Sequence, residues 1–100
     1  MEAIKDKGRI VLILKEGKVF EGMFLKVHYR CNESKNGGFI ISISKKLGKA
    51  VKRNYVKRVI RNCLINKETQ YDLLIRPKTL NVRYHDILED LNVFWDNIND

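Results

Sequence analysis

The side chains best suited to chemistry in this sequence are cations gathered between Lys45 and Arg61. Eight of these seventeen residues are basic and none is acidic; the eight are Lys45, Lys46, Lys49, Lys52, Arg53, Lys57, Arg58 and Arg61. Outside the segment basic and acidic residues balance, twelve of each, so the segment carries the whole net charge of +8. Clustering one sign of charge costs self-repulsion, and a polyanionic partner is the commonest reason to tolerate it. The segment therefore predicts binding to a phosphate backbone.

Groups that could activate a nucleophile or hold a metal ion are scattered. Cys31 and Cys63 belong to no CxxC or Cys/His cluster, which disfavours both a disulfide framework and a zinc site. His28 and His85 have no partner at metal-ligand spacing, and no nucleophile–base pair or carboxylate pair shares an element. We expect no catalytic residue and no metal ligand in this chain, and two reduced cysteines, with Cys63 in the core.

Length and composition favour a single domain spanning residues 1–100. Hydrophobic residues make up 44% of the chain, which is enough for a packed core. No stretch approaches the roughly 20 apolar residues of a membrane span, and the start MEAIKDKGRI lacks the apolar run of a secretory signal. We expect a cytoplasmic protein with no membrane partner.

The basic segment is predicted to form a helix from Lys49 to about Asn66. At 100° per residue, one sector of this helix is apolar and is expected to be buried; it holds Val56, Val59, Ile60 and Cys63. The opposite side combines four polar side chains with one small residue that allows close approach, namely Ala50, Asn54, Lys57, Arg58 and Arg61. This side is the predicted binding surface.

Two strands are predicted before the basic helix. Met23 to Arg30 alternates apolar and polar residues with a period of two, which predicts the first strand. Gly38 to Ser44 is the second. One of its faces would carry Phe39, Ile41 and Ile43, and the other would carry Ile40, Ser42 and Ser44. The polar connector between them ends in Asn36-Gly37-Gly38, which predicts a turn with positive φ.

After the basic helix, Tyr71 to Arg76 is predicted to be a short strand stopped by Pro77. A terminal amphipathic helix follows, and its apolar face predicts that Phe94 and Trp95 belong to the core. Near the start, Arg9 to Leu14 is ambiguous: its β-branched content favours a strand, and its spacing with a following glycine also fits a short helix. The residues alone lean towards the strand.

The central sequence FIISISKKLGKAVKRNYVKRVIRNCL contains three elements at fixed spacing. They are a strand ending in Ser-x-Ser-Lys-Lys, a Gly-x-Ala-Val helix entry, and the run from Arg53 to Arg58 followed by Arg61. In these the chain resembles the bacterial ribonuclease P protein subunit, although Tyr55 stands where that family usually has a basic residue. The resemblance implies an α+β two-layer sandwich: a small mixed sheet packed by helices, with the basic helix crossing over between parallel strands. It also implies a helix for Arg9 to Leu14.

The resemblance implies a subunit of an endoribonuclease that removes the 5′ leader of precursor tRNA, with ribonuclease P RNA and precursor tRNA as partners. Mg²⁺, bound mainly by the RNA subunit and the substrate, would supply the chemistry. Contacts with the catalytic RNA would come from the eight clustered cations together with Asn54. A groove between the sheet and the basic helix would take the single-stranded leader, and its candidate residues are Leu25, Val27, Ser42, Ser44 and Arg53.

Three other functions compete with this interpretation. A ribosomal-protein-like binder of structured RNA would share the basic helix and lack a substrate surface. A helix-turn-helix DNA binder needs a short helix directly before the basic one, where GFIISIS is typical of a strand, so DNA is not an expected partner. A self-sufficient nuclease is disfavoured because the sequence groups no catalytic residues.

Overall fold

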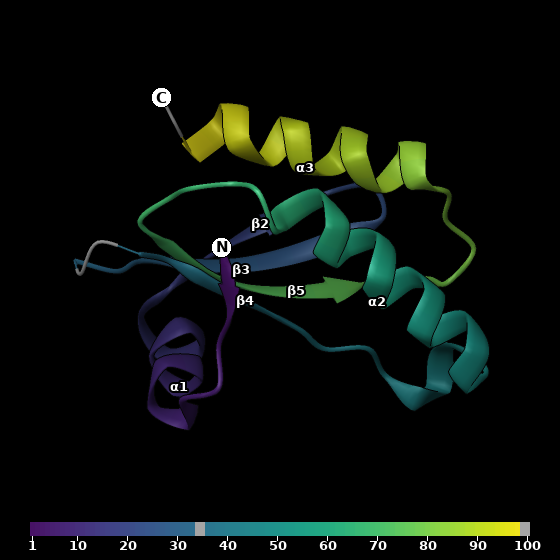
Figure 1. Cartoon of the computed structure of the whole chain (residues 1–100), viewed down its shortest axis with the longest axis horizontal. Helices are drawn as coiled ribbons and strands as arrows, with labels where there is room; N and C mark the ends of the chain where they lie inside the picture. Colours follow the sequence, from purple (N-terminus) through teal and green to yellow (C-terminus); the bar gives the residue numbers. More distant parts are fainter. Residues whose placement is uncertain (34–35, 99–100) are drawn as a thin grey trace.

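In residues 1–33 and 36–98, which the computed structural model describes, the chain forms a mixed sheet of five strands with three α-helices (Figure 1). The elements in chain order are β1 (Glu2–Ala3), α1 (Lys7–Glu16), β2 (Lys18–Glu21), β3 (Leu25–Cys31), β4 (Gly38–Ile41), the 3-10 turn η1 (Lys45–Leu47), α2 (Ala50–Leu64), β5 (Tyr71–Pro77) and α3 (Tyr84–Ile98). None of the described helices is long and apolar enough to span a membrane.

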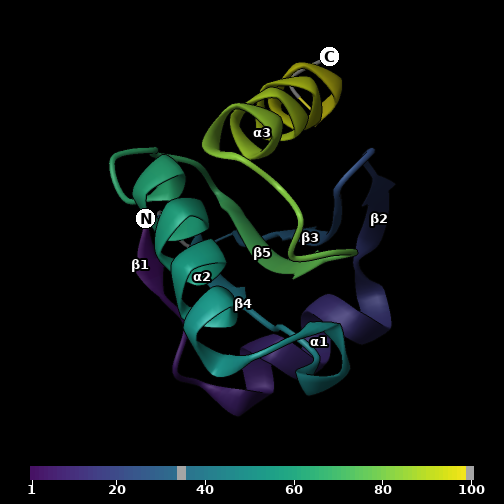
Figure 2. The same cartoon turned by 90° about the vertical axis from the view of Figure 1, so that its right-hand side faces the viewer.

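The strand order β1-β4-β5-β3-β2 places β5 at the centre of the sheet. β4 runs parallel to β1 and β5, whereas β3 runs antiparallel to β2 and β5. Helices α2 and α3 cover one face, and α1 packs on part of the other (Figure 2). The predicted α+β fold is therefore confirmed, with the basic helix α2 as the crossover between parallel β4 and β5.

The main core lies between the sheet and the layer of α2 and α3. Strand β3 alternates as predicted and sends the fully buried Leu25 and Val27 into this core. Phe94 and Trp95 of α3 are buried too, so the prediction that they are core residues is confirmed. Cys63 of α2 is only partly buried, and this burial raises the pKa of its thiol. The apolar periodicity thus identifies the buried face of both helices, but Cys63, predicted to be a core residue, lies at the margin of the core.

The strand favoured by residue type for Arg9 to Leu14 is wrong, because the segment lies within α1. The Asp6 side chain caps the helix by accepting a hydrogen bond from the Gly8 amide at 2.8 Å. Ile13 is 1% exposed and packs in a second small core, which shows tertiary packing overriding β-propensity. The helix implied by the family resemblance is confirmed.

The positive φ predicted at Asn36-Gly37-Gly38 is wrong for its two glycines, neither of which has a positive φ, and residues 34 and 35 of the predicted connector lie outside the described part of the chain. Glycine is required at both positions because backbone atoms of other segments lie very close to them. A Cβ on Gly37 would lie 2.8 Å from the Thr69 carbonyl oxygen, and one on Gly38 would lie 2.9 Å from the Glu2 carbonyl oxygen. Neighbouring backbone therefore leaves no room for a side chain at either position.

The boundaries of all three predicted strands differ from those observed. β3 runs from Leu25 to Cys31 rather than from Met23 to Arg30. β4 ends at Ile41, before Ser42 and Ser44. β5 includes Pro77, which pairs with Leu25 as the last residue of the strand. Proline is tolerated at this end because the ladder does not use its missing amide.

The buried carboxylate of Asp72 joins four segments of the fold. It accepts hydrogen bonds from Arg9 Nη2 at 2.5 Å and Nε at 3.2 Å, from the Gly38 amide at 3.0 Å, and from the Asn32 side chain. The Asp72 side chain is 3% exposed, and its hydrogen bonds to Arg9 raise the pKa of the guanidinium. This single group fixes α1 and the start of β4 against the central strand.

Replacing Asp72 by asparagine should destabilise the fold by about 2–3 kcal/mol, because it removes the charge that pairs with Arg9 and leaves partners unsatisfied. The melting temperature should fall by roughly 10–20 °C, which urea or thermal unfolding followed by circular dichroism would measure. The matched control is Asp96→Asn on the exposed side of α3, which should change stability by less than about 0.5 kcal/mol. Equal stability of the two variants would contradict a structural role for Asp72.

Candidate nucleic-acid interface

Helix α2 is held to the sheet by one face and displays its cations on the other. Val56, Ile60 and Leu64 are fully buried in the main core. All the predicted contact residues on this helix and its entry are exposed except Arg53, which is half-buried and donates a hydrogen bond from Nε to the Gly48 carbonyl oxygen at 3.2 Å. The apolar sector therefore orients the basic face outward, as predicted.

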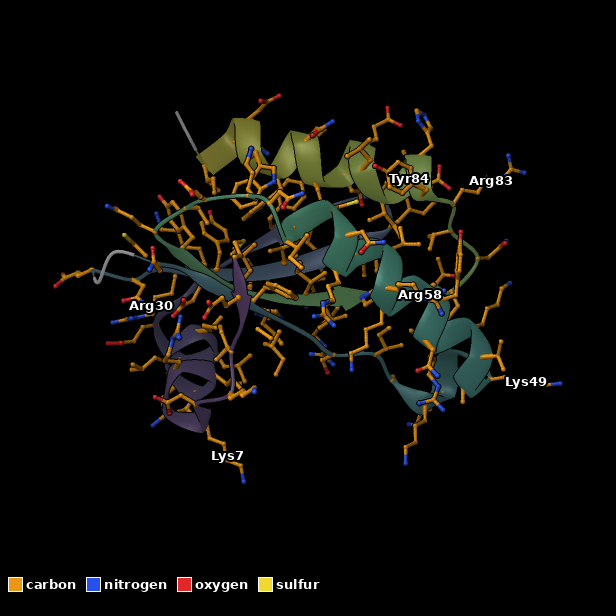
Figure 3. The ribbon with its side chains drawn as sticks, viewed as in Figure 1. Lys7, Arg30, Lys49, Arg58, Arg83 and Tyr84 are labelled. Atoms are coloured by element: carbon orange, nitrogen blue, oxygen red, sulfur yellow. The ribbon has the colours of Figure 1, made fainter. Side chains whose placement is uncertain are left out.

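The clustered cations have no carboxylate partner within the described part of the chain. The ion pairs formed there by lysine and arginine involve Arg9, Lys26, Arg30 and Lys78, none of which lies between Lys45 and Arg61. Figure 3 shows Arg58 on α2 and Lys49 projecting from its start. Surface cations left unneutralised in this way remain available to phosphate groups.

The start of α2 concentrates positive charge where the helix dipole is already positive. Its first turn contains no acidic residue, and its N-cap, Lys49, makes no side-chain capping hydrogen bond. Lys52 and Arg53 add two cations to this end, against the usual preference for anions there. Unsatisfied amides and cations at one helix end form a surface complementary to an anion.

Four of the predicted RNA-contact residues on α2 line one side of a groove; they are Asn54, Lys57, Arg58 and Arg61. The groove has a volume of about 770 Å³, and its other side comes from β4, from the end of β1 and from the residues that follow β1. Sequence reasoning missed the contribution of Ala3 and Lys5 to this groove. The sequence held no signal for them, because only the pairing of β1 with β4 brings the N-terminal segment to α2.

The five residues predicted to line the leader groove do not form one surface. Leu25 and Val27 are 0% exposed and lie beneath α2 and α3, so they are core residues and cannot contact a ligand. Ser42 and Ser44 are exposed beyond the end of β4, and Ser44 caps η1 by accepting from the Lys46 amide at 3.2 Å. Helices α2 and α3 cover the face of the sheet on which the leader groove was predicted.

The other face of the sheet carries a row of polar side chains that sequence reasoning did not group. Lys26 of β3 lies opposite Arg76 of β5 in the strand register. The Ser42 amide donates to the Ile75 carbonyl oxygen at 2.9 Å, so strand alternation places the Ser42 side chain beside Arg76. Nearby, burial lowers the pKa of His28, and the charges of Lys26 and Arg76 lower it further. The row combines two cations with a hydroxyl.

Together, the mixed sheet, the crossover helix and its unneutralised cations define a small basic α+β protein of the nucleic-acid-binding class. The sequence model of the Ribonuclease P family matches residues 1–99, and the chain belongs to this family. Membership gives it a general role in tRNA processing, as the RNA-binding protein component of a ribonucleoprotein nuclease.

Relatives and solved structures agree with the family. The chain is 29% identical over 94 residues to the ribonuclease P protein component of Acholeplasma laidlawii and 32% identical over 95 residues to that of Listeria welshimeri, in each case over 88% of this chain and 80% of the relative. The RNase P protein of Staphylococcus aureus has a TM-score of 0.83 at 26% identity, covering 98% of this chain and 95% of that one. The Thermotoga maritima protein has the same fold, with a TM-score of 0.82 at 23% identity and 97% coverage of both chains.

Binding to structured RNA should depend steeply on salt. If about six of the eight clustered cations neutralise phosphates, log K should fall with log salt at a slope of roughly −4 to −5, because each contact releases condensed counterions. Filter binding between 50 and 300 mM KCl, approximately, would measure the slope. A slope shallower than about −2 would contradict binding through this cationic surface.

Proposed function

We propose that this chain is the protein subunit of ribonuclease P, binding the catalytic ribonuclease P RNA and the 5′ leader of precursor tRNA. The observation that carries the proposal is the exposed face of α2, where clustered cations lack carboxylate partners among the described residues. Family membership supports an RNA partner, and the two surfaces of the fold support two separate RNA contacts.

The α2 surface suits the catalytic RNA. The guanidinium groups of Arg58 and Arg61 can each grip a phosphate with two parallel hydrogen bonds, whereas Lys57 acts as a compact point charge. Asn54 lies in the same face and can both donate to and accept from the sugar–phosphate backbone. A rigid helix presents these groups at fixed separations, so RNA binding requires little ordering of the protein backbone.

The polar row on the open sheet face suits the single-stranded leader. Lys26 and Arg76 can hold successive phosphates, and Ser42 offers a hydroxyl beside them. Exposed Leu14 of α1 and Val19 of β2 supply apolar surface on the elements bordering the sheet. Single strands are bound by such a combination of positive charge and apolar contacts. This assignment replaces the groove predicted over Leu25 and Val27.

The protein's part in cleavage would be binding rather than bond-breaking chemistry. Residues 1–33 and 36–98 hold no cluster of three or more potential metal ligands, so no residue of this chain is assigned to Mg²⁺. Mg²⁺ held mainly by the RNA and the substrate would activate the attacking water. The cations of α2 would reduce repulsion between RNA phosphates and so lower the Mg²⁺ concentration needed for cleavage.

Arg58→Ala and Arg61→Ala should each weaken affinity for a bacterial ribonuclease P RNA by about 1–2 kcal/mol, the cost of a lost charge-assisted contact. Both side chains lie on the exposed face, so thermal stability should stay within about 0.5 kcal/mol of the unmutated protein. Lys7→Ala, which removes one cation from α1 at a distance from α2 (Figure 3), is the control for net charge and should leave RNA affinity unchanged. A large loss of stability with RNA affinity intact would show that the orientation of α2 is wrong.

The reconstituted holoenzyme should bind precursor tRNA more tightly than mature tRNA, because only the precursor carries a leader. Arg76→Ala should reduce this preference by roughly 5- to 30-fold and spare assembly with the RNA subunit. The two dissociation constants are measured for each holoenzyme, with Arg83→Ala at the start of α3 as the matched control. Equal affinity of the unmutated holoenzyme for both tRNAs would favour a ribosomal-protein-like RNA binder without a substrate surface.

A further inference from the structure

The groove between α2 and the sheet edge differs in chemistry from a simple cationic surface. Its helical side is polar, but its opposite side includes Phe39 and Ile41 of β4 and Ala3 of β1, which strand alternation and pairing place on the same face of the sheet. Ile41 is partly exposed. A volume of about 770 Å³ is within the range of roughly 300–1,000 Å³ typical of sites for small organic groups. The groove therefore combines an apolar floor with a rim of hydrogen-bond donors.

The floor also presents an open strand edge. β1 pairs with only Gly38 and Phe39 of β4, and the ladder ends where the Ile4 amide donates to the Phe39 carbonyl oxygen at 2.8 Å. Backbone groups of alternate residues point to the same side of a strand, so the N–H and C=O of Ile41 face this edge as those of Phe39 do. Neither group of Ile41 has a backbone partner towards this edge among the described residues. One donor and one acceptor are thus presented side by side.

The charges around the groove select the kind of ligand. Lys57, Arg58 and Arg61 stand on one side and Lys5 on the other, and no described acidic residue lines the space between them. A second groove, near the N-terminus, is lined by both Glu2 and Glu68 as well as by cations. A rim of cations alone favours a polyanion over a neutral or basic peptide strand.

We propose that this groove holds one unpaired base of the RNA bound by α2. The apolar floor takes the face of the base, the Ile41 backbone edge hydrogen-bonds its polar edge, and the cations of α2 hold the flanking phosphates. A duplex cannot insert a base against the strand edge, because its bases are stacked and their Watson–Crick edges are already paired. The proposal rests on the proposed function, since it specifies what the α2 surface recognises in the catalytic RNA: an unpaired nucleotide in addition to phosphate.

Filling the groove without changing charge tests the proposal. Ala3→Trp places a large ring into the groove from the exposed edge strand β1, and Val93→Trp adds the same ring to the exposed surface of α3 as a matched control. Affinity for a bacterial ribonuclease P RNA, its salt dependence, and protection of individual RNA bases from dimethyl sulfate and carbodiimide are measured with each protein. Circular dichroism checks that each variant is folded.

The unmutated protein and Val93→Trp should protect the same small set of unpaired bases. Ala3→Trp should lose protection at one of them and bind roughly 5- to 100-fold more weakly, the range for one lost base contact, with an unchanged salt slope because every cation remains. Unchanged affinity and protection in folded Ala3→Trp would overturn the proposal and leave the strand edge to a peptide ligand.

A second arm keeps the test independent of the folding of Ala3→Trp. Removing the protected base to leave an abasic nucleotide should weaken binding of the unmutated protein by the same factor, and should have no further effect on Ala3→Trp. Full affinity for the abasic RNA would overturn the base-binding proposal while leaving the proposed function standing. Failure of the unmutated protein to bind any ribonuclease P RNA would instead remove the proposed function itself.

Discussion

The arrangement of the sheet depends on one buried carboxylate, that of Asp72 in the central strand. A buried carboxylate without hydrogen-bonding or charged partners destabilises the folded state, so the partners of Asp72 must be held in place. Arg9 brings α1 to one face, and the Gly38 amide fixes where β4 begins. Helix α2, which connects β4 to the parallel strand β5, packs on the opposite face of the sheet. The hydrogen bonds of this acidic group thus align the two strands that the basic helix connects.

The crossover helix balances burial against charge repulsion. Each fully buried apolar side chain, such as Val56, Ile60 and Leu64, contributes about 1.5–3 kcal/mol, whereas exposed like charges are screened by solvent and salt. Burial therefore holds α2 in place without any ion pair along its outer face in the described chain. This leaves the cations free of internal partners, as binding to a polyanion requires. The groove described above lies where the buried apolar side of α2 meets its charged side.

The sequence predicted those features that are encoded locally. The period of 3.6 residues identified α2 and its buried face, and the period of two identified β3, because both signals lie within a single element. Pairings between distant residues could not be predicted in this way. Asp72 lies 63 positions from Arg9, and Lys26 meets Arg76 only through the strand register. For α1, the residues alone allowed both a strand and a helix and leaned towards the strand; packing of an apolar side outweighed that preference, and the family resemblance implied the helix.

The central place of β5 in the sheet has a consequence for how the protein is made. Until Tyr71 to Pro77 has left the ribosome, β3 and β4 have no shared neighbour, and of the antiparallel pairings only the local one between β2 and β3 can form. The basic helix precedes β5 in the chain, so its cations are exposed before the sheet beneath them exists. Non-local pairing of this kind slows folding, and a nascent chain emerges over seconds. RNA close to the ribosome can therefore meet the charged helix while the remainder of the fold is still incomplete.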